Sequence, residues 1–312
     1  MQKRKLWILA VLTIIALVGA ACAPTPAPEK KMTLEMAKRM IAAAEAKAKE
    51  MGIPFVITVV DIGGNLVAQE RMEGALLASI DISRNKAYTA VALKMPTSDL
   101  APLSVPGESL YGIAQTSGGR AIVFGGGFPI EVDGQLIGGI GVSGSSVEND
   151  MACAKAGLEA VSSTEPVPAP SPPTKGEKLT PEIAKWMIAA AEAKAKEMGI
   201  PFVITAVDIG GDLVFQERMD GALLASIDIS RNKAYTAVAL KMPTSDLAPL
   251  SVPGKSLWGI DKTSGGRVIV FGGGFPVKVD GKLIGGFGVS GSSVENDMAC
   301  AKAGLEALKG IK

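Results

Sequence analysis

Residues 74–107 read GALLASIDISRNKAYTAVALKMPTSDLAPLSVPG, and residues 221–254 repeat this stretch letter for letter. Outward from it, residues 31–161 align with residues 178–308 without a gap and differ from them at 18 positions. The period is far longer than the roughly 20–50 residues of a solenoid repeat. The sequence therefore predicts one fold written twice, with the first domain at residues 32–161 and the second at residues 179–312.

Within each copy, the order of elements decides the fold class. In the first copy, Thr33 and Gly52 are typical of the start and the end of a helix. The repeated stretch has helical spacing over residues 76–94, and Pro96 ends it.

Strands are predicted at residues 54–61, 66–72, 120–124, 128–132 and 136–144, and a last helix at 147–160 begins with a capping box of Ser145 and Glu148. Hairpins and helices do not alternate as βαβ units do. The predicted class is α+β, with a mostly antiparallel sheet flanked by helices.

The N-terminus has the pattern of a targeting segment. The basic stretch MQKRK precedes an apolar run over residues 6–21, and Cys22 follows small residues at once. This pattern predicts a lipoprotein signal peptide at residues 1–22, lipidation at Cys22 and a Pro-rich tether at residues 23–31. The expected product is an exported, extracytoplasmic lipoprotein held in the cell envelope by its N-terminal lipid anchor. An ordinary signal peptide and an uncleaved signal anchor are the alternatives.

Composition excludes several classes of function. The net charge is +1 with acids and bases mixed evenly, which predicts no nucleic-acid surface. The chain contains no histidine, which excludes His-ligated zinc, His-ligated haem and any triad with an imidazole base. No carboxylate pair, nucleophile motif or metal-ligand cluster is recognisable, so no catalytic residue is predicted. Cys153 and Cys300 occupy equivalent positions of the repeat and are expected to be small buried helix residues.

Two nearly identical domains in one chain favour docking on each other. A domain that forms twofold homodimers can be fused into one chain and keep its interface. The Pro-rich linker at residues 162–178 is long enough to permit this arrangement. We therefore expect an intramolecular pseudo-dimer, with independent domains as the alternative and a higher homo-oligomer left open.

The spacing of glycines and acids resembles the GlcG/HbpS-like haem-binding family, which includes the C-terminal domain of PduO-type adenosyltransferases. The matching stretches of the first copy are residues 59–75, 78–90, 96–97, 106–113 and 118–144. The second copy matches from Ala206 to Gly291, with Trp258 in place of Tyr111. The resemblance implies a profilin-like α+β fold, assembly through dimers, and binding of a small planar ligand, namely haem or a related tetrapyrrole. Because histidine is absent, it implies no particular iron ligand.

Candidate ligand contacts follow from chemistry together with this resemblance. They are Lys86, Tyr88, Thr97, Phe124, Gly125 and Gly126 in the first copy and Lys233, Tyr235, Thr244, Phe271, Gly272 and Gly273 in the second. A tyrosine phenolate can hold ferric haem, a threonine hydroxyl is a weak alternative, and a lysine can pair with propionates. The triple glycine offers backbone to a flat ligand.

Each candidate also has a structural interpretation. Thr97 suits the N-cap of a short turn, Tyr88 suits the edge of the core, and the triple glycine suits a bulge or tight crossing. Arg71 is either an anion contact or a strand-end charge, and Asp61 is a turn-forming carboxylate.

The expected function is that of an exported binding protein for haem or a related tetrapyrrole. The alternatives are an enzyme that degrades haem or acts on another small molecule, and a structural or sensory surface protein without a ligand.

Overall fold

The computed structural model describes residues 30–311, so the predicted signal peptide, Cys22 and most of the tether lie outside the described residues. Elements of the first copy are α2 (Leu34–Met51), β1 (Val56–Asp61), β2 (Leu66–Arg71), α3 (Ser79–Leu93), α4 (Thr97–Leu103), β3 (Gly127–Val132), β4 (Gln135–Ser143) and α5 (Val147–Glu159). Those of the second are α6 (Pro181–Met198), β5 (Val203–Asp208), β6 (Leu213–Arg218), α7 (Ser226–Ala239), α8 (Thr244–Leu247), β7 (Gly274–Val279), β8 (Lys282–Ser290) and α9 (Val294–Ala307).

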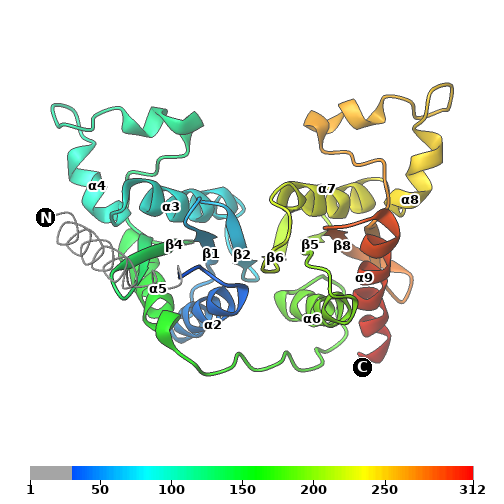
Figure 1. Ribbon diagram of the computed structural model, residues 1–312, viewed down its shortest axis with the longest axis horizontal. Coiled ribbons are helices and arrows are strands. Elements are labelled where there is room, and N and C mark those ends of the chain that lie inside the picture. Colours follow the sequence, from blue (N-terminus) through cyan, green and yellow to red (C-terminus); the bar gives the residue numbers. More distant parts are fainter. Residues whose placement is uncertain (1–29, 312) are drawn as a thin grey trace, which may run out of the picture. The chain divides into compact units, whose positions relative to one another are not determined.

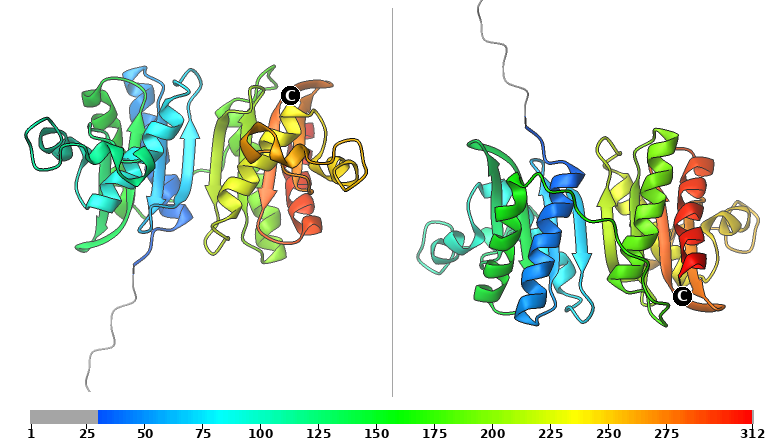
Figure 2. Two further views of the ribbon diagram at one scale, coloured as in Figure 1. Left: turned by 90° about the horizontal axis from the view of Figure 1, so that it is seen from above. Right: turned by 90° about the horizontal axis from the view of Figure 1, so that it is seen from below.

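The strands of both copies form one antiparallel sheet in the order β3-β4-β1-β2-β6-β5-β8-β7 (Figure 2). The copies meet where β2 pairs with β6, with Gln69 opposite Gln216 at the centre of the register. Pairing removes an exposed edge from each four-stranded half. The α+β class and the helix-flanked antiparallel sheet are confirmed.

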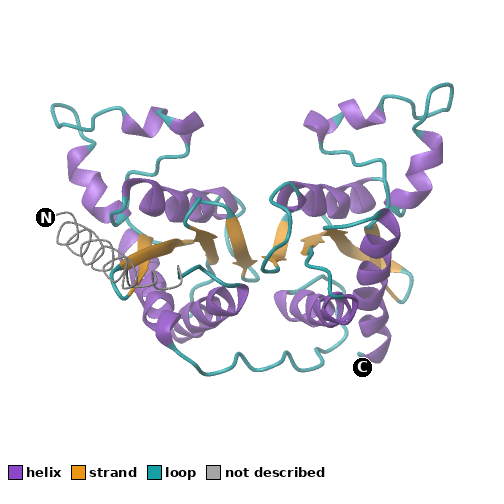
Figure 3. Ribbon diagram, in the orientation of Figure 1, coloured by secondary structure: helices purple, strands orange, loops and turns teal. Residues whose placement is uncertain are grey.

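Helices cover both faces of the sheet (Figures 1 and 3). Helices α3 and α7 lie on one face, and α2, α5, α6 and α9 lie on the other. This explains why β1 is a continuous buried run instead of an alternating one: Val60 packs in a cluster with Ala87 of α3, whereas Val59 belongs to the large core that includes α2. Close helix packing requires glycine on β4, because a Cβ at Gly141 would lie 2.1 Å from the carbonyl oxygen of Ser83.

Some local details differ from the sequence expectation. Residues 120–124, expected to be a strand, have no regular structure, because β3 begins only at Gly127. The N-cap of α5 is Ser146, which accepts a hydrogen bond from the N–H of Asn149, and not Ser145. The loop after Pro96 contains the helix α4, which is longer than a single turn.

The linker and the cysteines agree with expectation. Residues 163–180 contain no helix or strand, as a proline-rich spacer should. Cys153 and Cys300 are buried free thiols, and burial raises the pKa of each to about 12. Among residues 30–311, no helix is long and apolar enough to cross a bilayer.

Candidate functional site

Lys86 is one of the fully buried residues among the predicted site residues. It lies on α3 with no exposed surface, and its Nζ donates hydrogen bonds to Asp150 at 2.6 Å and to the carbonyl of Val142 at 2.9 Å. Lys233 makes the same contacts with Asp297 and Val289. Burial lowers the pKa of both lysines, although the partner carboxylates oppose it. Both ammonium groups therefore form ion pairs within their own copy. The expected contact of these lysines with the propionates of a haem stays a prediction.

The triple glycine wraps around this ammonium group. Gly126 has φ +115°, and a Cβ there would lie 2.6 Å from Nζ of Lys86. A Cβ on Gly125 would meet Met151 at 2.7 Å, and one on Gly127 would meet the carbonyl oxygen of Lys86 at 2.5 Å. The close crossing predicted as the structural interpretation therefore accounts for all three glycines.

Phe124 is the member of this turn that faces solvent. Its side chain is 40% exposed, and its ring centroid lies 4.9 Å from Nζ of Lys86. Phe271 has the same exposure and the same contact with Lys233. A planar ligand would therefore find an open phenylalanine ring here, whereas Gly125 and Gly126 are enclosed by neighbouring side chains.

Thr97 has a fully buried hydroxyl that acts within the chain. It accepts a hydrogen bond from the N–H of Gly127 at 2.9 Å, and Thr244 accepts one from Gly274 at 3.0 Å. The oxygen was expected to cap its own short helix; instead the cap residue is Pro96, and the threonine fixes the start of β3. Its contact with a ligand stays a prediction.

Tyr88 lies on the side of α3 away from Lys86, because a separation of two residues turns about 200° around a helix. Its half-buried ring is covered by the guanidinium of Arg120, which lies 3.6 Å from the ring centroid. Tyr235 is covered by Arg267 at the same distance. The structure therefore brings Lys86, Thr97 and the glycine turn together and separates them from the tyrosine. Sequence reasoning missed the arginine partner, because it lies beyond a long loop.

That loop forms an arm, defined here as residues 104–126, with residues 251–273 as its equivalent. Most of its residues are exposed, including Val105 and Tyr111, the latter with 66% of its surface accessible. The hydroxyl of Thr89 on α3 anchors its end, since it accepts a hydrogen bond from the N–H of Ile122 at 3.0 Å. In the second copy, Trp258 takes the place of Tyr111 and is 61% exposed. Figure 1 shows both arms extending away from the sheet.

Lysines at the junction form ion pairs that cross from one copy to the other. Lys38 contacts Glu192 at 2.6 Å and Glu217 at 3.1 Å in the second copy. Reciprocally, Lys185 contacts Glu45 at 2.8 Å and Glu70 at 2.7 Å in the first.

Arg71 and Asp61 also act across the junction. Arg71 pairs with Asp208, and Arg218 pairs with Asp61 at 2.7 Å. Asp61 additionally accepts the N–H of Gly63 at 2.9 Å, which confirms its expected role in the turn. Arg71 thus joins the two copies. The sequence had suggested either an anion contact or a strand-end charge, and neither interpretation included this role.

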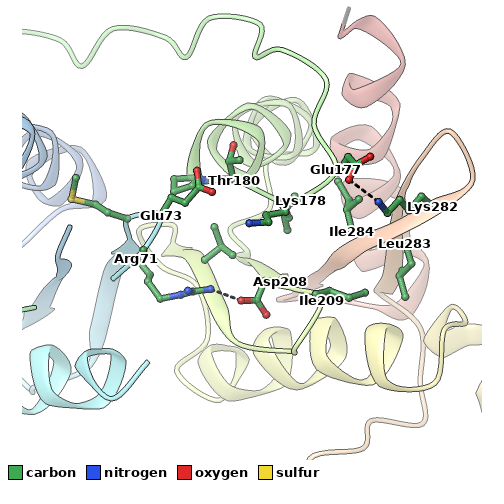
Figure 4. Close-up of a pocket in the computed structure, with 15 residues that line it drawn as sticks. Arg71, Glu73, Glu177, Lys178, Thr180, Asp208, Ile209, Lys282, Leu283 and Ile284 are labelled. Atoms are coloured by element: carbon green, nitrogen blue, oxygen red, sulfur yellow. Dashed lines mark hydrogen bonds and ion pairs between the residues drawn. The ribbon is translucent and has the colours of Figure 1, made fainter. Parts of the chain in front are cut away.

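Two cavities lie at this junction, and none of the twelve predicted site residues lines either of them. One, of about 420 Å³, is bordered by Arg71, Asp208 and the end of the linker, and Figure 4 shows Arg71 directed toward Asp208. The other, of about 580 Å³, lies between α2 and α6. Among residues 30–311, no group of three or more acidic or thiol side chains is arranged to hold a metal ion.

Comparison with known proteins gives the same division of the chain. The family model described as "Haem degrading protein HbpS-like" matches residues 32–159 and 179–306. An uncharacterized 15.0 kDa protein of Citrobacter freundii, encoded in the dhaT-dhaS intergenic region, is 46% identical over 131 residues, which are 42% of this chain and 92% of that protein.

Two further similarities involve PduO. The corrinoid adenosyltransferase PduO of Salmonella typhimurium is 38% identical over 148 residues, which are 46% of this chain but only 43% of that enzyme. A crystal structure described as a PduOC:Heme complex is 37% identical, with a TM-score of 0.42, and covers 43% of this chain and 96% of that one.

Proposed function

This chain belongs to the HbpS-like family, whose model matches both copies, and we propose on that basis that each copy binds haem or a related tetrapyrrole. The double family match is the observation that carries the proposal. Two sites per chain follow from it, because the candidate residues are the same in both copies.

The chain's own side chains fit a planar ligand along the arm better than inside the fold. Phe124 and Tyr111 offer exposed aromatic surface, whereas Lys86 and Thr97 are occupied by internal contacts. Stacking on aromatic rings and burial of apolar area supply most of the affinity for a flat apolar ligand. Arg120, already stacked on a tyrosine, is a cation available to a propionate.

Bound haem would supply an iron centre that an oxygen-bearing side chain of this chain would hold. With no histidine in the chain, Tyr88 and Tyr235 are the phenol oxygens that both copies share. The substitutions Tyr88→Phe and Tyr235→Phe remove only those oxygens. They should abolish a phenolate-type visible spectrum and leave apolar binding in place.

The test is a haemin titration of the full chain followed by its Soret band. We expect a saturable shift with two equivalents per chain. The pair Tyr111→Ala and Trp258→Ala should weaken binding, whereas the matched pair Ile62→Ala and Ile209→Ala, also exposed but outside the arm, should not. Absence of any Soret shift at micromolar haemin would refute the proposal.

The family's description as haem degrading favours one second candidate, turnover of haem. Loss of the Soret band in the presence of a reductant and oxygen, with release of a product, would support it. A stable spectrum under those conditions would leave binding as the function.

We also propose that the protein is exported and anchored by lipid at Cys22. The basic, apolar and small-residue pattern of residues 1–22 supports this. Cys22→Ser should abolish incorporation of radiolabelled palmitate and release the chain from the membrane fraction. Unchanged labelling would exclude Cys22 as the lipid site.

The pairing of the copies is proposed to preserve the interface of an ancestral homodimer. The reciprocal contacts of Lys38 and Lys185 support this, because a twofold interface repeats each contact in reverse. A protease site inserted at residue 166 should yield halves that still co-elute on size exclusion. Halves that separate would refute it.

A further inference from the structure

The larger junction cavity has walls, floor and roof from different parts of the chain. Its walls are one face each of α2 and α6, and its floor is formed by Glu70, Phe215 and Glu217 of the paired strands. Residues 167–171 of the linker form the roof, and in Figure 1 the linker runs along the α2 and α6 side of the sheet. A roof of this kind exists only because the copies are fused, so the site is a property of the tandem chain.

The floor carries carboxylate oxygens that the fold does not satisfy. Glu70 has no exposed surface; its Oε1 pairs with the ammonium group of Lys185 at 2.7 Å, and its Oε2 has no hydrogen-bond partner among the described residues. Oε1 of Glu217 is also without a hydrogen bond, and that residue is 1% exposed. Buried polar atoms left this way are costly unless a ligand or water completes them.

The charge of the lining favours a cationic occupant. Five glutamates face three lysines around the cavity: Glu35, Glu45, Glu70, Glu192 and Glu217 against Lys38, Lys49 and Lys185. Lys38 and Lys185 are each already shared between two carboxylates. Lys196 also pairs with Glu192 at 3.0 Å from outside the lining. Oε2 of Glu70 and Oε1 of Glu217 remain as acceptors without a donor, which favours donors that carry positive charge.

The shape of the lining further restricts the ligand. An acid with spare acceptor oxygen comes from each copy, and the two copies are related by the reciprocal register of β2 and β6. Apolar surface accompanies them, contributed by Ile41, Ile188, Phe215, Val167, Pro168 and Pro170. A slim molecule with an ammonium group at each end and an apolar middle matches this arrangement. Metal ions do not, because no suitable group of three ligands exists in the described residues.

We propose that this roofed cavity binds a linear aliphatic diamine, with one ammonium group on Oε2 of Glu70 and the other on Oε1 of Glu217. This site is separate from the arms and independent of tetrapyrrole binding. Its volume, about 580 Å³, lies within the range of small-molecule sites.

The test is calorimetric titration of the full chain with 1,4-diaminobutane, with butylamine and potassium chloride as comparison probes at matched ionic strength. We expect one diamine per chain and an affinity for butylamine at least about tenfold weaker, because one ammonium contact is lost. Binding at pH 7 should also release protons, seen as a dependence of the heat on the buffer, since an ammonium group beside a glutamate favours its ionised form.

Variants locate the site. The double substitution Glu70→Gln and Glu217→Gln keeps the shape and should weaken diamine binding at least about tenfold. Glu50→Gln, an exposed acid on the same helix as Lys38, should leave it unchanged. Unaltered circular dichroism of the double variant shows that it is folded. No saturable heat with the diamine, equal binding of butylamine, or unchanged affinity in the folded double variant would each overturn the proposal.

Discussion

The junction glutamates should make the stability of this protein depend on pH near neutrality. Burial raises the pKa of Glu70 and of Glu217 from 4.5 to about 7, although Lys185 and Lys38 oppose the shift. Each glutamate titrates together with its own charged neighbours: Glu70 interacts with Lys185 and Glu45. Glu217 interacts in the same way with Lys38 and Glu192. The informative perturbation is the double substitution Glu70→Gln and Glu217→Gln, which fixes both sites in a neutral form.

The raised pKa determines in which direction the free energy of unfolding changes with pH. A carboxyl whose folded pKa exceeds its unfolded value favours the folded state when protonated, so its contribution is complete below about pH 4.5 and is lost as pH rises through about 7. A pKa that rises from 4.5 to about 7 on folding corresponds to a change of about 3 kcal/mol in the free energy of unfolding for each residue, at 1.36 kcal/mol per pKa unit. Coupling of each glutamate to its neighbouring charges makes the doubled value an upper bound.

The assay is urea unfolding followed by circular dichroism from pH 5 to pH 8.5. The difference in unfolding free energy between variant and wild type should grow in favour of the variant by several kcal/mol across this range. The comparison cancels titrating groups that do not interact with Glu70 or Glu217. Glu45 and Glu192, whose pKa values are lowered in the wild type by the nearby lysines despite burial, interact with the substituted residues and contribute to the measured difference. Parallel pH profiles for the two proteins would refute the assignment of this pH dependence to the junction.

Three other predictions concern the internal packing of each copy. Lys86→Met should lower the free energy of unfolding by about 3–5 kcal/mol, because it leaves a buried carboxylate unpaired; a loss within error in urea unfolding would contradict this. Gly126→Ala should lower the free energy of unfolding more than Gly134→Ala does, because both glycines have positive φ but only Gly126 lacks room for a Cβ. Equal midpoints of thermal unfolding for the two variants would show that the close crossing is unimportant. Cys153 and Cys300 should react with a thiol reagent at pH 8 only after unfolding, because burial raises each thiol pKa to about 12; rapid labelling of the native protein would disprove their burial.

Local signals in the sequence were sufficient for the regular elements. Thr33 and Gly52 predict the limits of α2, and the structure shows Thr33 as its N-cap and Gly52 in the left-handed conformation after it. Such signals depend on neighbours within a few residues, so they can be recognised in a single chain. The strand predicted at residues 120–124 is wrong, because a local pattern of apolar residues does not show whether a neighbouring strand will pair with it, and the described structure contains no strand there.

The candidate site could be predicted only in part. Residue type and the family resemblance suggested Lys86, Tyr88, Thr97 and Phe124 as ligand contacts, and those contacts stay predictions. Neither indicated that Thr97 and Lys86 would bind Gly127 and Asp150 within the chain. Those partners are 30 and 64 residues away in the chain, and nothing in the local pattern indicates them.

The sequence by itself determined the duplication, the α+β class and the lack of any imidazole, since repetition, periodicity and composition are properties of the chain alone. Only the tertiary structure decided that β2 meets β6 and that Lys38 and Lys185 cross to the other copy. It also decided that two buried glutamates, one from each copy, line the same cavity beneath a proline-rich segment of the linker. The reason is that burial and charge pairing depend on which distant surfaces come together, and a pattern repeated identically in both copies carries no information about how one copy faces the other.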